Sequence, residues 1–453
     1  MTAKRESAAV LVIGAGIVGI ATAYFLVRDH GYRKILIVDR GDPMAFTSAQ
    51  SGENYRNWWP HPLMVRFTDR SIDLMEEVAT ASGDPFRMTR RGYALATRRT
   101  SIDDLIDELR FGLGGEADRL IRFQDGLASY QPPVSEDWRT APDGVDVLTS
   151  RALIREMFPS FADDVANVIH IRRGGDIDSQ QMGAFMLEAV RFAGGRRLKG
   201  EVRSLATHGR FVAEVETQEG VVEIKADTVV NAAGPFARHI AQMAGIDLPI
   251  RAVLQQKIAF EDTAGAVPRG LPFAIDLDGQ EIDWPEEAKS ALLDDTGLAW
   301  LAGPMPGSIH CRPDGGGNWI KLGWAYNDTG ATPAWTPDLD GAFPEIVLRG
   351  AARLQPSLRT YYDRLPRARR HYGGWYAMTE ENWPLVGPVG PEGFFVNAGH
   401  SGFGTMAACA SGELVAAHVT GAALPDYASA MSPARYENEA LMTEARASGR
   451  GTL

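Results

Sequence analysis

Three glycines near the N-terminus have the spacing of a turn that binds phosphate groups. Gly14, Gly16 and Gly19 follow the apolar run 10–13 and begin a helix-compatible segment that reaches about His30. In a strand–turn–helix unit the first glycine makes the tight turn, the second lets the backbone approach a pyrophosphate, and the third packs helix against strand. Unpaired N–H groups at the helix N-terminus then attract the anion. The pattern predicts a dinucleotide site.

An acidic residue supports this interpretation of the glycines. A second apolar run, 34–38, ends at Asp39, twenty residues after Gly19. A dinucleotide-binding βαβ unit places the carboxylate that bonds a ribose hydroxyl at this distance. The uncharged stretch 8–27, behind Lys4 and Arg5, otherwise has the length of a membrane span and the pattern of a secretory signal. The strand, the helix and the spaced acid favour the βαβ unit.

Composition limits the class of protein. The chain has 453 residues, 45% hydrophobic and 23% charged, which is ordinary for a globular protein and long enough for two domains. A net charge of −12 without a basic run argues against a nucleic-acid partner. The two cysteines, Cys311 and Cys409, have no metal-binding spacing, so we expect no metal site, a reducing compartment and a cytoplasmic location.

A second glycine-rich turn lies far from the first. The apolar run 394–397 leads into Gly399, Gly402 and Gly404, and a helix is expected from about residue 405. Ser401 does not fit a hydrolase elbow, because that motif needs glycine at the position of Phe403. Two such turns, one near each end of the chain, indicate a long ligand such as FAD. Between them, residues 200–231 alternate as a three-stranded meander, and residues 278–279 are expected to form a hairpin turn.

Five segments in chain order resemble the D-amino acid oxidase superfamily, in the branch of sarcosine oxidase, glycine oxidase and secondary-amine dehydrogenases. They are the N-terminal fingerprint with Asp39-Arg40, TSAQSG at 47–52, GDID at 175–178, VVNAAGP at 229–235 and NAGHSGFG at 397–404. The resemblance implies an α/β (α+β) fold: a discontinuous Rossmann-type FAD-binding domain and an antiparallel-sheet substrate domain. We expect the first to comprise 1–85, 150–235 and 371–440, the second 86–149 and 236–370, and a flexible tail over 441–453.

The resemblance also implies which residues bind the cofactor. The ADP part is expected at the fingerprint, the pyrophosphate and ring near the TSAQSG segment, adenine beside residue 202, and the pyrimidine edge of the ring at the second glycine-rich turn. The expected cofactor residues are Gly14, Gly16, Ile17, Val18, Gly19, Asp39, Arg40, Ser48, Ser51, Gly52, Val202, Ala233, Gly234, Gly399, Gly402, Phe403, Gly404, Thr405 and Met406.

Fewer residues are candidates for the active site. Lys321 lies on the expected strand 315–324 and matches the lysine that sarcosine oxidase relatives hold against the flavin to activate oxygen. A solvated strand lysine would have the same pattern. Arg56 matches roughly an arginine near the substrate, although surface pairing would also explain it. The remaining candidates for the substrate pocket are Trp375, Tyr376, Met378 and His400, for which core packing is the alternative.

Some family positions are different here. Gly374 occupies the position of the cysteine that sarcosine oxidase joins to flavin, and the segment 48–56 has no histidine for the linkage of dimethylglycine dehydrogenases. FAD is therefore expected to be noncovalent. The second carboxylate-binding lysine is replaced by Met406, and the histidine four residues beyond the active lysine by Ala325. A simple N-methyl glycine is thus disfavoured. The adjacent tryptophans 58 and 59 suggest a larger or aromatic-capped secondary amine, although two tryptophans that anchor a loop would have the same pattern.

The resulting hypothesis is oxidation of the C–N bond of a secondary amine or N-substituted amino acid. Hydride transfer to flavin N5 would give an imine, and O2 would reoxidise the flavin with release of H2O2. The first alternative is a dehydrogenase of an amino acid or 2-hydroxy acid that passes electrons to a carrier. The second is a noncatalytic flavoprotein that acts as an assembly factor. The expected partners are a small-molecule substrate and O2 or a carrier, without nucleic acid or a membrane span.

Overall fold

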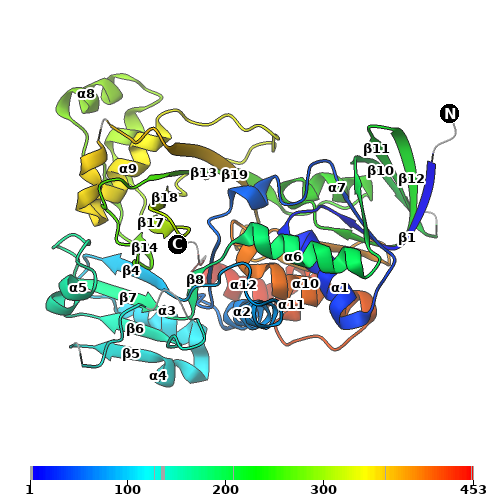
Figure 1. Ribbon diagram of the computed structural model, residues 1–453, viewed down its shortest axis with the longest axis horizontal. Helices are drawn as coiled ribbons and strands as arrows, with labels where there is room; N and C mark the ends of the chain where they lie inside the picture. The colour runs from blue at the N-terminus through cyan, green and yellow to red at the C-terminus, as the bar shows by residue number, and fades with distance from the viewer. Residues whose placement is uncertain are drawn as a thin grey trace.

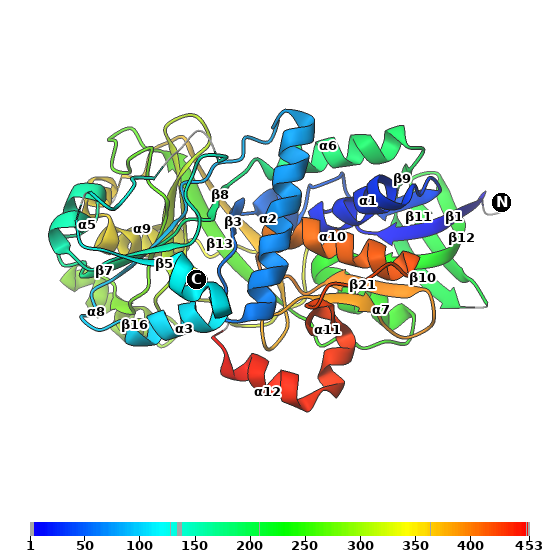
Figure 2. The ribbon, with the colours of Figure 1, turned by 90° about the horizontal axis from the view of Figure 1, so that it is seen from below.

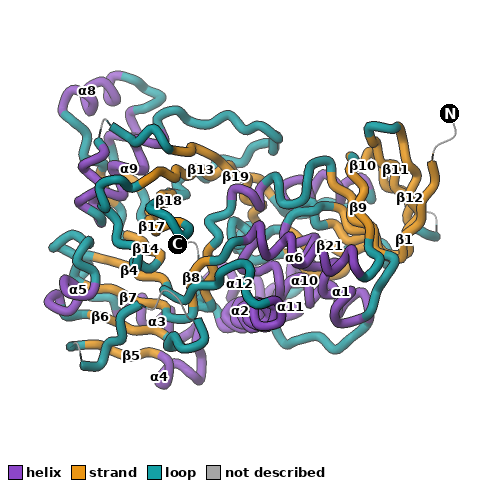
Figure 3. The backbone as a smooth tube through the Cα atoms, viewed as in Figure 1, coloured by secondary structure: helices purple, strands orange, loops and turns teal. Residues whose placement is uncertain are grey.

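The protein has two lobes, each built on a large β-sheet (Figure 1). The computed structural model describes residues 4–126, 128–133, 138–207, 209–362, 364–449 and 451. One lobe contains an eight-stranded sheet and the other a nine-stranded sheet. The short strand β8 lies between the lobes (Figures 1 and 3).

The N-terminal βαβ unit is present as predicted. β1 (Lys4–Ile13) leads into α1 (Ile17–His30), and β2 (Ile35–Asp39) returns parallel to β1. Side chains of β1 alternate between two cores: Val10 and Val12 pack with the helices, while Leu11 and Ile13 pack on the opposite face. A parallel strand buried on both faces reads as a continuous apolar run. This burial explains the uncharged stretch 8–27, and no helix among the described residues is long and apolar enough to span a membrane.

The first lobe completes its sheet with strands from three parts of the chain. The order is β10-β11-β12-β1-β2-β9, and β21 pairs with both β12 and β20. The predicted meander is confirmed by β10, β11 and β12, whose first turn includes His208, outside the described residues. The bounds are β9 Arg196–Lys199, β10 Glu201–Thr207, β11 Phe211–Thr217, β12 Gly220–Asn231, β20 Leu385–Pro388 and β21 Phe394–Ala398.

Helices cover one face of this sheet (Figure 2). α1 packs against α10 (Gly404–Thr420) and α6 (Ser179–Phe192), and α2 (Pro62–Ser82) packs on α10. The contact of α1 with α10 is close, since a Cβ built at Gly412 would lie 2.8 Å from the backbone of Ala21. Small residues therefore bring the two helices together. α7 (Ala237–Met243) contacts β10 and β12.

The second lobe is a mostly antiparallel sheet in the order β19-β13-β18-β17-β14-β4-β7-β6-β5. α9 (Phe343–Leu354) packs on β13, β17 and β18. Apolar side chains such as Ile258 and Leu322 face the core that α9 shares, which leaves the alternate residues on the opposite face. The strands are β4 Tyr93–Thr97, β5 Ile121–Gln124, β6 Val145–Leu148, β7 Asn167–Ile171, β13 Arg251–Glu261, β14 Phe273–Asp276, β17 Ile309–Asp314, β18 Trp319–Gly323 and β19 Arg369–Met378.

Shorter elements join the lobes and decorate them. β3 pairs with β8, and β15 with β16, as two-stranded ribbons. Their bounds are β3 Asn54–Arg56, β8 Gly174–Asp176, β15 Gln280–Glu281 and β16 Pro304–Met305. The remaining α-helices are α3 Asp103–Leu113, α4 Ala117–Leu120, α5 Arg151–Met157, α8 Glu286–Asp294, α11 Ala428–Met431 and α12 Glu439–Ala447.

Several strands and one helix lie in a different lobe from the one expected from the predicted domain boundaries. β7, within 150–235, and most of β19, within 371–440, belong to the nine-stranded sheet, while α7 packs on the first lobe. The segment expected as a tail over 441–453 contains most of α12. The hairpin at Asp278-Gly279 is wrong, because β14 pairs with β4 and β17 while β15 pairs with β16. Alternation of apolar residues predicts a strand but not its partner.

Candidate cofactor and active site

A long cavity runs from the N-terminal glycine turn to the face of the nine-stranded sheet. The empty space inside it, including the open mouth, is about 1490 Å³. Most predicted cofactor residues line it: Gly14, Gly16, Ile17, Val18, Asp39, Arg40, Ser48, Ser51, Gly52, Val202, Ala233, Gly234, Gly399, Gly402, Gly404 and Thr405. Gly19, Phe403 and Met406 do not line it. The two glycine-rich turns therefore meet in one cavity, as predicted.

The glycine turn is held by backbone contacts and by Asp39. A Cβ at Gly14 would lie 2.2 Å from the carbonyl oxygen of Ala232, and one at Gly19 would lie 2.1 Å from that of Gly14. A Cβ at Gly16 would meet only the hydroxyl of Ser48, at 3.1 Å. Thus two of the glycines are required by the protein's own packing, whereas Gly16 borders the cavity.

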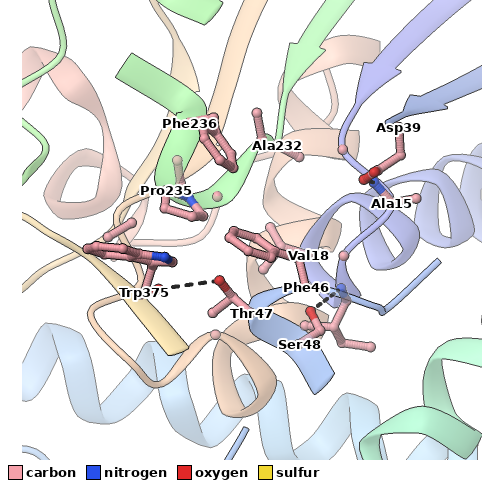
Figure 4. Close-up of a pocket in the computed structure, with 18 of the residues that line it drawn as sticks. Ala15, Val18, Asp39, Phe46, Thr47, Ser48, Ala232, Pro235, Phe236 and Trp375 are labelled. Carbon is pink, nitrogen blue, oxygen red and sulfur yellow. Dashed lines mark hydrogen bonds between the residues drawn. The ribbon is translucent and has the colours of Figure 1, made fainter. Parts of the chain in front are cut away.

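Hydrogen bonds fix the carboxylate and the first helical turn (Figure 4). The amide of Ala15 donates to one oxygen of Asp39 at 2.6 Å, and the amide of Gly41 donates to the other at 2.7 Å. Burial raises the pKa of Asp39. The amide of Ile17, the first residue of α1, donates to the hydroxyl of Ser48 at 3.0 Å, while the N-cap residue Gly16 has no side chain to cap the helix. The carboxylate of Asp39 thus fixes the backbone of the glycine turn where it lines the cavity.

The second glycine turn, which lines the same cavity, contains an acceptor that has no partner among the described residues. Burial lowers the pKa of His400 to about 3, so its imidazole is neutral. Nε2 lies 3.0 Å from the amide oxygen of Asn397, whose nitrogen donates to Thr22. Nε2 therefore carries the proton, and Nδ1 is a buried acceptor without a partner among the described residues. A ligand with an N–H or O–H group would donate to this Nδ1 atom. Because the cavity offers this acceptor as well as free space at Gly16, its residues fit a dinucleotide cofactor.

The N-terminus of α10 meets the TSAQSG segment at this end. The hydroxyls of Ser51 and Thr405 lie 2.9 Å apart, and the amide of Arg56 donates to the sulfur of Met406 at 3.1 Å. Gly404 and Thr405 line the cavity, so the positive end of the helix dipole points into it and favours negative charge there.

Trp375, Tyr376 and His400 line the cavity as expected, whereas Met378 does not. The ring of Tyr376 covers Gly402, where a Cβ would lie 2.2 Å from it. Thr47 donates to the carbonyl oxygen of Trp375 at 3.4 Å (Figure 4). Strand β19 thus brings the second lobe against the segment 47–52.

Arg56 is buried beside the cavity in an aromatic cage. Its guanidinium lies 5.3 Å from the ring centre of Trp59, 5.5 Å from that of Tyr93 and 5.9 Å from that of Trp58. It donates to the carbonyl oxygens of Trp58, at 3.1 Å, and Gly451. No carboxylate lies within 4 Å of it among the described residues, and burial lowers its pKa to about 10. Arg56 does not line the cavity itself.

Lys321 lies in a buried network of charges and does not line the cavity. Its Nζ is 3.2 Å from Asp314 and 3.4 Å from Glu53. Arg312 contacts the same two carboxylates at 2.9 and 3.7 Å and also lies 3.8 Å from Asp176. Burial, followed by the charge of Arg312, lowers the pKa of Lys321.

Among the cavity residues that were absent from the expectations, Lys257 and Trp335 bring a charge and a large aromatic ring. Lys257 of β13 is 4% exposed, and its Nζ donates to the hydroxyl of Tyr376 at 3.2 Å. Trp335 comes from the loop before α9, packs at a tilt against Phe46 with ring centres 4.5 Å apart, and lies under Arg40. Neither residue belongs to a glycine-rich motif, so the sequence contains no spacing that would have identified it.

Comparison with known proteins identifies the family. A family model described as FAD dependent oxidoreductase (DAO) matches residues 9–418. The chain belongs to this family. The resemblance to the D-amino acid oxidase superfamily is thereby confirmed, and the protein is an FAD-dependent oxidoreductase.

The relatives are distant in sequence. Mitochondrial dimethylglycine dehydrogenase of Homo sapiens is 23% identical over 283 residues, which are 61% of this chain and 29% of that protein. The match thus spans less than a third of the relative's length. L-proline dehydrogenase from P. horikoshii shares the fold with a TM-score of 0.71 at 20% identity, over 96% of this chain and 99% of that chain. Iminodiacetate oxidase from Chelativorans sp. BNC1 has a TM-score of 0.70 at 19% identity, over 94% and 98%.

Proposed function

We propose that this protein oxidises the C–N bond of a secondary amine or N-substituted amino acid to an imine, with FAD bound noncovalently in the cavity. The proposal rests chiefly on one observation: the cavity joins the N-terminal glycine turn to the buried face of a second sheet. FAD supplies the acceptor of a hydride when it is bound. A small amine is then oxidised in the space that the second sheet encloses.

The cavity residues divide the work of holding the cofactor. Gly16, which has no side chain, leaves room for a pyrophosphate at the N-terminus of α1, while Asp39 and Arg40 would hold the ribose. The N-terminus of α10 stabilises negative charge at the ring end. No cysteine or histidine stands at Gly374 or in 48–56, which supports a noncovalent cofactor.

The substrate class is inferred from charge and from the relatives. Arg56 is a buried cation without a carboxylate partner among the described residues, and its aromatic neighbours give it a flat, apolar surround. A carboxylate beside the amine would satisfy it. Dimethylglycine, L-proline and iminodiacetate, the compounds named for the relatives, each combine a substituted nitrogen with a carboxylate.

The proposal also includes the cellular compartment of the protein and the acceptor that reoxidises its flavin. Cys311 and Cys409 are buried free thiols, which supports a reducing compartment such as the cytoplasm. Reoxidation by O2 with release of H2O2 is the proposed second half-reaction. Transfer to an electron carrier is the alternative, because the relatives include dehydrogenases as well as an oxidase.

The cofactor site is tested by the variant Gly16→Val. Gly16 has φ −75° and ψ 174°, an extended backbone that valine adopts freely, and its Cβ would meet only Ser48. The fold should survive while the side chain fills the phosphate turn. We expect a folded, colourless protein, with Gly115→Val as a yellow control because its Cβ would meet nothing within 4 Å. A yellow Gly16→Val variant would show that the pyrophosphate lies elsewhere.

The reaction is tested by anaerobic bleaching of the flavin with secondary amines, amino acids and 2-hydroxy acids. Bleaching by an N-substituted amino acid, followed by oxygen uptake and peroxide on aeration, is the expected result. Bleaching without reaction with oxygen would make the protein a dehydrogenase. Bleaching by 2-hydroxy acids alone would overturn the proposed substrate class.

A further inference from the structure

The nine-stranded sheet presents two buried lysines on the face turned toward the first lobe. β13 and β18 are antiparallel, with Ala259 opposite Lys321 and Lys257 opposite Gly323. Residues directly opposite each other share a face of the sheet, and so do residues two apart on one strand. Lys257 and Lys321 are therefore diagonal neighbours, and they differ in what surrounds their charges.

The charge of Lys321 is compensated within the protein. Asp314 and Glu53 lie within 3.4 Å of its Nζ. The wider network holds three cations, Arg91, Arg312 and Lys321, against three carboxylates, Glu53, Asp176 and Asp314. With equal numbers of opposite charges in contact, little positive field extends from this cluster into the cavity.

The charge of Lys257 is not compensated. No carboxylate lies within 4 Å of its Nζ in the part of the chain that the structure describes, and its hydrogen-bond partner there is the hydroxyl of Tyr376. An ammonium group has three donors, so two remain for a ligand. A buried cation without an anion is costly. This cost is relieved if the site's ligand brings negative charge.

The position of Lys257 indicates which end of a ligand it meets. It lines the cavity together with Gly52 and Tyr376, and its Cε lies 3.9 Å from a Cβ built at Gly52. Gly52 adjoins Ser51, whose hydroxyl contacts Thr405 at the start of α10, and the ring of Tyr376 covers Gly402 just before that helix. The ammonium group and the helix N-terminus therefore act on the same region.

We infer that Lys257, rather than Lys321, supplies the positive charge that stabilises negative charge on the flavin ring. The inference rests on the proposed FAD site. Lys321 instead acts as a positioning residue: with Arg312 it holds Glu53, and thereby the adjoining residues Ser51 and Gly52, which line the cavity.

Sulfite is a suitable probe, because it adds to oxidised flavin and leaves negative charge on the ring. Its affinity is read from the loss of visible absorbance of the holoenzyme. Removing a full charge at close range should weaken binding by about tenfold or more in Lys257→Met. Lys257→Arg keeps the charge and should stay within about threefold of the parent. Lys321→Met should weaken sulfite binding less than Lys257→Met does, while lowering the midpoint of urea unfolding because two carboxylates lose a cation.

Further measurements separate this inference from a structural effect. FAD content and circular dichroism establish that each variant is folded and loaded, and Lys257→Gln, which retains a donor for Tyr376, replaces Lys257→Met if the latter loses FAD. Sulfite affinity near that of the parent in both neutral variants would overturn the inference. A larger loss in Lys321→Met would return the role to Lys321. A parent that binds no FAD would instead refute the proposed function on which the inference rests.

Discussion

Neutralising Glu381 should destabilise the fold far more than neutralising its neighbour Glu380. The side chains of Glu381 and Arg435 are both fully buried, and the guanidinium donates to the carboxylate through Nε at 2.8 Å and through a second nitrogen. The hydroxyl of Tyr436 donates to the same oxygen at 3.0 Å. Glu380 and its partner Arg446 are 68% and 54% exposed, at 3.4 Å. Glu381 and Glu380 are adjacent in the sequence but differ in burial, so the same substitution at each gives a test variant and its matched control.

The magnitude follows from burial. Removing one partner of a buried ion pair costs about 3–5 kcal/mol, because the remaining charge has no counter-ion. Arg435 also donates to the carbonyl oxygens of Pro384 and Trp383, at 2.6 and 3.0 Å, which offsets part of that cost. We therefore expect Glu381→Gln to lower the free energy of unfolding by about 3 kcal/mol. Glu380→Gln should lower it by less than about 1 kcal/mol, since an exposed pair contributes little.

Urea unfolding of both variants, followed by fluorescence and circular dichroism, measures the difference. The extrapolated free energies should differ by about 2 kcal/mol or more. Equal values would mean that the carbonyl oxygens around Arg435 compensate its charge without Glu381. The segment after α10 would then be held to the loop before β20 by dipoles rather than by an ion pair.

Three further expectations follow. Replacing Arg56 by methionine should weaken substrate binding in anaerobic bleaching by about 2–5 kcal/mol, if the guanidinium binds a carboxylate; unchanged affinity would show that another group holds the substrate. Acid precipitation should leave the flavin in the supernatant, because Gly374 offers no nucleophile, and a yellow pellet would contradict this. Burial lowers the pKa of His170 to about 3, so the unfolded state takes up the proton as pH falls below about 6.5 and stability is lost toward pH 3. His170→Gln should remove about 2 kcal/mol of the decrease between pH 7 and 5 in urea unfolding, and an unchanged pH dependence would assign it to other groups.

Local spacing predicted the parts of the site that are built by local structure. The glycine turn, Asp39 and the second glycine-rich turn each depend on residues within one strand–turn–helix unit, and all reach the same cavity. The meander was equally readable, because its strands pair with their neighbours in sequence. The FAD-binding lobe was therefore largely predictable.

The active-site face was harder to predict, because it depends on register between distant strands. Lys257 lies in the segment LQQKIAF, whose alternation gives a strand but not the face that meets the cavity. Lys321 was expected from its position on a strand, yet its carboxylate partner Glu53 comes from 268 residues earlier in the chain. The contact of Arg56 with Gly451 spans 395 residues. Pairings over such separations leave no local signal.

The pairing of β12 with β21 has a consequence for how the chain is made. Val229 lies beside Phe394 in this parallel pair, and α1 packs against α10, which begins at Gly404. The cavity is complete only after these C-terminal residues have left the ribosome. At about 5–20 residues per second, that is roughly 20–80 s after the N-terminal glycine turn has been synthesised. During this interval the apolar surfaces of β1 and α1 lack their final partners, so aggregation of nascent chains competes with loading of the cofactor.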